Sequence, residues 1–131
     1  LAEEISKEAA KKNVDVNILV EVNVAGEETK FGTGCEEAKQ LVRDIAQLPH
    51  VHIQGLMTIA PYVENSEENG IYFQQLKKLW VDISSENIDN VSMKVLSMGM
   101  TGDYAVAVSE GATYVRVGTG IFGERNYAVS V

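Results

Sequence analysis

The sequence is poor in cysteine and proline and contains no long hydrophobic run. Its single cysteine, Cys35, cannot form an internal disulfide bond, which favours a reducing compartment. No apolar stretch approaches the roughly 20 residues that a membrane-spanning helix needs. Residues 1–12 are acidic at the front and lack the basic-then-apolar order of a signal peptide. We therefore expect a cytoplasmic protein.

Basic side chains are also scarce: the 131 residues contain 11 Lys and Arg against 19 Asp and Glu, for a net charge of −8. Nucleic acids and anionic membranes are bound by clustered basic side chains, so the composition argues against both partners. The two histidines, His50 and His52, flank the amino end of a predicted strand and are interpreted as structural. We predict no metal site and no catalytic residue.

The sequence does contain a regular alternation of helices and strands. Its periodicity predicts helices over residues 1–12, between Thr33 and Pro49, over 66–84 and over 102–110, and strands over 14–24, 51–60, 93–98 and 113–118. Such alternation is typical of a parallel sheet covered by helices. Two architectures fit: an open flavodoxin-like sheet, or about four of the eight units of a (β/α)8 barrel, at roughly 31 residues a unit.

The faces of the predicted strands favour the barrel. In the first strand the valines share one face, and the other face carries polar side chains that include Glu21 and Asn23. The second strand places His52, Gln54 and Thr58 on its more polar side. A central strand of an open sheet is apolar on both faces, whereas a barrel strand packs one face on helices and lines a lumen with the other. For the first strand alone, an edge strand with one wet face is the alternative.

The stretch SMGMTGDY (97–104) predicts an anion site after the third strand. Thr101 sits where a helix N-cap belongs, which would leave the following amides, beginning with Gly102, free at the positive end of the helix dipole. A second lobe, Gly118 and Thr119, follows the last strand. The loops after the last two strands form the commonest phosphate site of (β/α)8 barrels. The alternative is a helix cap and a glycine turn that bind nothing.

Between these two lobes, Arg116 is predicted to face the lumen. A buried guanidinium without an acceptor is costly, so a partner is expected. Glu21 would make a purely structural partner. The functional alternative is an acceptor on a ligand, such as a heteroaromatic ring nitrogen.

Four strings resemble a known family, the pyridoxal-phosphate homeostasis proteins of the YggS type, which share a barrel with alanine racemases. The strings are EVNVAGEETKFG (21–32), IQGLMTIAP (53–61), FQQL (73–76) and LSMGMTGDYAVAVSEGATYVRVGTGIFGERNY (96–127). The combination of LSMGM-T-GD with VRVGT-x-IFG carries most of this resemblance, which covers nearly the whole chain.

The resemblance implies a pyridoxal 5'-phosphate site. In the family, the positions of Thr101, Gly102, Gly118 and Thr119 hold the cofactor phosphate, and the arginine of the VRVG string, here Arg116, faces the pyridine nitrogen. A guanidinium donates to that nitrogen without protonating it, which suits a carrier or a racemase that avoids a long-lived carbanion. Two further cofactor-binding candidates are Met57, in the GLMT string, and Asn23, in the first matching string.

The family holds its cofactor as a Schiff base on a lysine of the first barrel strand, which has no counterpart here. Residues 1–131 are therefore expected to be the C-terminal half of an alanine-racemase-like barrel, from the fourth helix to the eighth strand and tail, with the N-terminal half and its lysine absent. Such a half barrel leaves two raw strand edges, through which two copies are expected to pair or to aggregate.

The function favoured by these observations is non-enzymatic binding and homeostasis of pyridoxal phosphate. One alternative is an amino-acid racemase of the same barrel class. Such racemases take their second base from a β-domain that follows the barrel, and none is expected here. The other alternative is an open-sheet domain that binds a different phosphate ligand.

Overall fold

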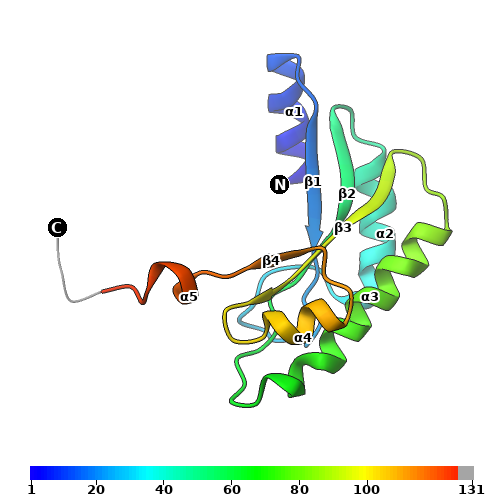
Figure 1. The fold of residues 1–131 in the computed structure, drawn as a ribbon. Coiled ribbons are helices and arrows are strands. Elements are labelled where there is room, and N and C mark those ends of the chain that lie inside the picture. Colours follow the sequence, from blue (N-terminus) through cyan, green and yellow to red (C-terminus); the bar gives the residue numbers. More distant parts are fainter. Residues whose placement is uncertain (127–131) are drawn as a thin grey trace.

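Four parallel strands form the centre of the part of the chain that the structure describes (Figure 1). The computed structural model describes residues 1–126. The strands are β1 (Val16–Glu21), β2 (Val51–Met57), β3 (Val91–Met100) and β4 (Tyr114–Arg116), and they lie in the sheet in their chain order. An open doubly wound sheet reverses its strand order at a switch point, and a barrel does not. The unbroken order confirms the prediction of four strands of a barrel.

Within residues 1–126, six helical segments accompany the sheet. They are α1 (Ala2–Lys12), α2 (Cys35–Ala46), the 3-10 turn η1 (Ser66–Asn69), α3 (Gly70–Ser85), α4 (Tyr104–Ser109) and α5 (Thr119–Phe122). Helices α2 and α3 pack against β2 and β3, and α5 projects from the body after β4 (Figure 1). Within residues 1–126, no helix is long and apolar enough to span a membrane.

One face of the sheet is buried under the helices. The core contains Val20, Val22, Ile53, Leu56, Leu96 and Met98 from the strands and their ends, with Val42, Phe73, Leu76 and Ile83 from α2 and α3. Each such aliphatic or aromatic side chain stabilises the fold by about 1.5–3 kcal/mol. The alternate positions of the first strand, including Asn17, Glu21 and Asn23, stay at least partly exposed. The predicted division into an apolar and a polar face is confirmed.

The register of β2 changes at Gly55, where the pairing shifts on both sides of the strand. The backbones approach so closely here that a Cβ on Gly55 would lie 1.8 Å from the Val95 carbonyl oxygen. The shift corrects one prediction. Thr58 does not join His52 and Gln54 on the polar side but is fully buried, and its hydroxyl donates to the Val22 carbonyl at 2.6 Å.

Gly55→Ala should therefore lower the free energy of unfolding by at least about 3 kcal/mol, because the methyl group can be accommodated only if two strands separate. Gly70→Ala is the matched control: its Cβ would meet only a Val106 methyl at 3.7 Å, at the start of α3. There alanine should be neutral or stabilising by up to about 1 kcal/mol. Urea unfolding measures both, and equal stabilities for the two variants would contradict the packing described for β2 and β3.

Candidate functional site at the carboxyl ends of the strands

The two predicted lobes meet at one hydroxyl group. Thr101 follows β3 directly, and its Oγ1 accepts hydrogen bonds from the amides of Gly118 (3.2 Å) and Gly120 (3.1 Å), which follow β4. The Thr119 hydroxyl oxygen lies 3.4 Å from the same atom. Gly120 allows this approach, since a Cβ there would lie 2.8 Å from a Thr101 methyl carbon. The structure therefore brings the two lobes into direct contact.

The predicted capping role of Thr101 is wrong. Helix α4 begins at Tyr104, and its N-cap is Asp103. The Asp103 carboxylate accepts from the Met100 amide at 2.7 Å and closes the turn before the helix, while the Asp103 amide donates to the Met100 carbonyl at 3.3 Å. The Thr101 hydroxyl therefore accepts hydrogen bonds from the amides at the start of α5 instead.

Two backbone amides at this place have no acceptor in the part of the chain that the structure describes: those of Gly102 and Thr119. Gly102 is exposed, and no atom lies within 4 Å of the position that a Cβ would take. The lobes together thus present four amides and two hydroxyl groups around a site open to solvent. This is a set of donors suited to an anion.

Arg116, on β4, is half-buried beside these lobes. Its guanidinium donates to the Ser97 hydroxyl and, at 2.7 Å, to the Thr58 carbonyl. Across residues 1–126 no ion pair joins Arg116 to Glu21, so the structural alternative for its partner is not formed. Burial lowers the pKa of Arg116, and the carboxylates of Glu21 and Asp103 oppose that shift. The guanidinium keeps its charge, with unused donors left on it.

Met57, at the carboxyl end of β2, lies in the row of the sheet that contains Ser97. It is paired with Glu21 on β1 and with Ser97 on β3. The preceding residue, Leu56, is fully buried in the core, and side chains alternate along a strand, so Met57 points to the open face. Ser97, which holds Arg116, is its neighbour across the strands. A contact between Met57 and a ligand stays a prediction.

Asn23 is not brought to the two lobes. Its side chain closes its own loop: Nδ2 donates to the Glu27 carbonyl at 2.7 Å, and Oδ1 accepts from the Glu27 amide at 3.2 Å. The same loop turns back onto the outer edge of β1, where Thr33 exchanges backbone hydrogen bonds with Glu21 and Asn23. A cofactor-binding role for Asn23 therefore stays a prediction that the contacts of this loop do not favour.

The contacts of three residues that hold the site together were not predicted from the sequence. Ser97 and the Thr58 carbonyl hold Arg116, and Asp103 holds the turn that carries Thr101. Asp103 stands inside the string 96–127, but nothing in the pattern says that its carboxylate turns back to an amide. A backbone carbonyl such as that of Thr58 leaves no signal in a sequence.

Known proteins share this architecture. The family model described as "Alanine racemase, N-terminal domain" matches residues 1–126. The chain belongs to this family. A relative from Aquifex aeolicus (strain VF5), named "Pyridoxal phosphate homeostasis protein", is 50% identical over 127 residues, which make up 97% of this chain and 55% of the relative. The chain thus spans about half the length of the curated relatives it matches.

Two solved structures of similar proteins agree with the fold. The crystal structure of an unknown protein from Bifidobacterium adolescentis superposes with a TM-score of 0.87 at 39% identity, covering 92% of this chain and 48% of that one. The structure of PipY of Synechococcus elongatus PCC7942 with PLP bound superposes with a TM-score of 0.80 at 29% identity, covering 93% and 56%. The four strands of this family member are accordingly a half barrel.

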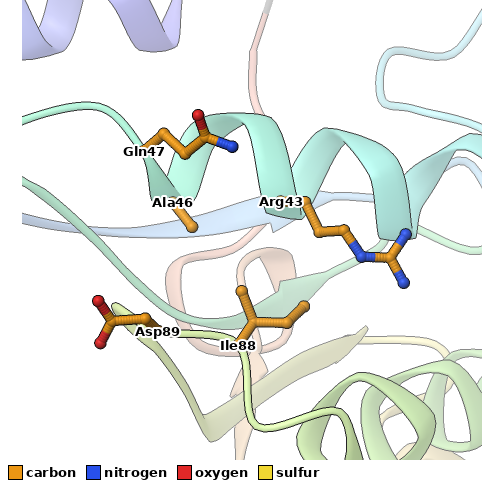
Figure 2. Close-up of a pocket in the computed structure, with 5 residues that line it drawn as sticks. All are labelled: Arg43, Ala46, Gln47, Ile88 and Asp89. Atoms are coloured by element: carbon orange, nitrogen blue, oxygen red, sulfur yellow. The ribbon is translucent and has the colours of Figure 1, made fainter.

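A separate pocket lies away from the lobes of this alanine racemase-type half barrel. Figure 2 shows its lining: Arg43, Ala46 and Gln47 around the end of α2, and Ile88 and Asp89 before β3. It is open, measures about 590 Å³, and lies at the amino ends of the strands, opposite Thr101 and Arg116. None of the predicted site residues lines it.

Within residues 1–126, no group of three or more His, Cys, Asp or Glu is placed to hold a metal ion.

Proposed function

We propose that the chain binds pyridoxal 5'-phosphate without catalysing a reaction, as part of a protein that buffers or carries this cofactor. The observation that carries the proposal is the convergence of the Gly118 and Gly120 amides on the Thr101 hydroxyl oxygen. An oxygen of a phosphate group fits the same donors, and charged acceptors form stronger hydrogen bonds than a neutral hydroxyl does. The donors of Gly102 and Thr119 complete the cup.

Binding of the cofactor would replace the Thr101 hydroxyl oxygen by a phosphate oxygen as the hydrogen-bond acceptor. The Gly118 and Gly120 amides would donate to the phosphate, and the Thr101 hydroxyl would turn from accepting to donating. These groups are held in place before the ligand arrives, so little ordering entropy is lost at the strand ends. The role of the four predicted residues Thr101, Gly102, Gly118 and Thr119 as phosphate ligands rests on this arrangement.

Arg116 would supply the selectivity for a pyridine ring. Bound pyridoxal phosphate supplies an electron sink when its ring nitrogen is protonated, and a guanidinium donates a hydrogen bond there without giving up its proton. Ser97 and Thr58 use two of the donors of Arg116 and fix its orientation. This chemistry suits a carrier, and it equally suits a racemase that avoids a long-lived carbanion, so an activity assay has to separate the two. Measurable racemisation of amino acids by the chain with pyridoxal phosphate would favour the racemase alternative instead.

Binding by this chain is proposed to be non-covalent. Lys94 is exposed near the amino-terminal part of β3, and the phosphate lobes follow the other end of that strand.

We further propose that the four strands are the C-terminal half of the barrel. The support is the position of the lobes after β3 and β4, since barrel phosphate sites follow the last two strands. Residues 127–131 of the tail lie outside the described residues.

A titration with pyridoxal phosphate, followed by visible absorbance, tests the proposed function. We expect saturable binding that borohydride does not trap, and a loss of about 10- to 100-fold in affinity in Thr101→Val, because a hydrogen bond to a charged group contributes roughly 1.5–3 kcal/mol. Thr113→Val is the control, since among the described residues that hydroxyl bonds to the Leu96 backbone and not to the lobes. No binding by the parent chain, or equal affinity in both variants, would refute the phosphate cup.

We also propose that two copies pair edge to edge through β4 and the amino-terminal part of β1, since Thr33 already occupies the outer edge of β1 at its carboxyl end. On the β1 side, Leu1, Ile5 and Val14 line an apolar groove along α1. On the β4 side, Val115 and Val108 expose 38% and 55% of their surface. In a (β/α)8 barrel each helix covers the seam between two strands, so α1 of one copy would cover Val115 of the other.

Sedimentation equilibrium tests this pairing. We expect a dimer at about 100 µM for the parent chain, and a monomer for Val115→Glu, because the glutamate would place a charge in the apolar seam. Ile71→Glu is the control, since Ile71 is 57% exposed on α3, away from either edge. A monomeric parent chain, or dissociation in both variants, would count against pairing through these edges.

A further inference from the structure

Asn69 joins the ends of two strands although its side chain belongs to neither predicted lobe. It is only 1% exposed, and its Nδ2 donates to the Pro61 carbonyl and to the Asp103 carboxylate, each at 2.9 Å. Pro61 belongs to the segment after β2, and Asp103 to the turn after β3. A single amide group thus fastens two neighbouring strand ends to each other.

Because it makes these two bonds, the Asn69 side chain does not cap the helix that follows it. Asn69 directly precedes α3, where an asparagine side chain commonly accepts a hydrogen bond from the first turn of the helix. No such bond forms here. In the described part of the chain its Oδ1 is buried and has no partner. Leaving a buried acceptor unpaired costs about 1–3 kcal/mol, so the orientation is set by the two donated bonds.

A short path leads from Asn69 to the phosphate cup. The Asp103 carboxylate that Asn69 holds also accepts from the Met100 amide at 2.7 Å. This bond fixes the turn that carries the next residue, Thr101, and the Thr101 hydroxyl receives the amides after β4. Both ends of the cup therefore depend on where the Asp103 carboxylate lies.

The position of the negatively charged Asp103 carboxylate affects how well an anion can bind nearby. The carboxylate is close enough to Arg116 to oppose the lowering of its pKa. Near a phosphate group, a mobile carboxylate would repel the ligand by Coulomb interaction. Here its two oxygens are engaged, one by Asn69 and one by Met100. Holding the carboxylate against these donors keeps it from turning toward the cup.

We propose that Asn69 is a positioning residue for the phosphate cup: it holds the Asp103 carboxylate and thereby sets the turn that presents Thr101. Its relevance to a phosphate ligand rests on the proposed function. The positioning itself is a property of the ligand-free chain and can be tested without any ligand.

Amide hydrogen exchange of the ligand-free chain is the first test. In Asn69→Asp, which keeps the shape but removes both donors, we expect the amides of Met100, Gly118 and Gly120 to exchange at least about tenfold faster. Amides within β1 and β2 should keep their rates. Ser6→Ala is the control for a lost buried hydrogen bond elsewhere, since that hydroxyl donates to the Pro49 carbonyl at 2.6 Å. Unchanged exchange at the three amides overturns the proposal.

A ligand-based test separates positioning from general loss of stability. The measured quantity is the phosphate increment, which is the ratio of the affinity for pyridoxal phosphate to the affinity for pyridoxal. Asn69→Asp should lower this ratio about tenfold, and Ser6→Ala should leave it unchanged. A variant that merely unfolds more easily lowers both affinities together and leaves the ratio alone.

A double variant that swaps the side chains of Asn69 and Asp103 gives the sharpest comparison. The double variant Asn69→Asp, Asp103→Asn restores a donor opposite a carboxylate and keeps the net charge, so most of the phosphate increment should return. Asp103→Asn alone measures the separate effect of removing the charge. No recovery beyond that single variant overturns the proposal. If the parent chain binds no pyridoxal phosphate, the proposed function fails, and hydrogen exchange still decides the role of Asn69.

Discussion

In β1 and β2 the face toward the helices is the more buried one and the other face stays partly exposed, and much of the molecule follows from that division. Helices α2 and α3 cover the apolar face formed by residues such as Val20, Leu56 and Leu96. The opposite face carries partly exposed charged side chains such as Glu21 and Arg116, and the buried Ser97 hydroxyl accepts a hydrogen bond from Arg116. Because all four strands are parallel and keep their chain order, their carboxyl ends lie at one edge. Segments distant in sequence meet there.

The candidate site is built from short connections rather than from a deep cavity. Thr101 links the segments after β3 and β4, and Arg116 is held between Ser97 and the Thr58 carbonyl. Asn69 then ties the segment after β2 to the turn that carries Thr101. These contacts join the ends of β2, β3 and β4 to one another, so the geometry of the cup depends on the register of those three strands.

Much of this arrangement was predictable from the sequence, since alternation of valine with polar residues and recurrent helical periodicity report directly on which faces are buried. The failures have physical causes. Thr58 was placed on the wrong face because a backbone shift at Gly55 breaks the period of two. Thr101 was expected to cap α4, but the Asp103 carboxylate closes that turn by a bond to a backbone amide. Asn69 acts across 34 residues of sequence, a separation that no local pattern reveals.

The central claim is that the strand ends of this half barrel form a phosphate cup before any ligand binds. The most direct measurement is a set of amide NMR spectra of the chain with pyridoxal phosphate and with pyridoxal. The account predicts that the shifts specific to the phosphorylated ligand fall on Gly102, Gly118, Thr119 and Gly120. Phosphate-specific shifts confined to the pocket between Arg43 and Asp89, or none at the strand ends, would contradict it.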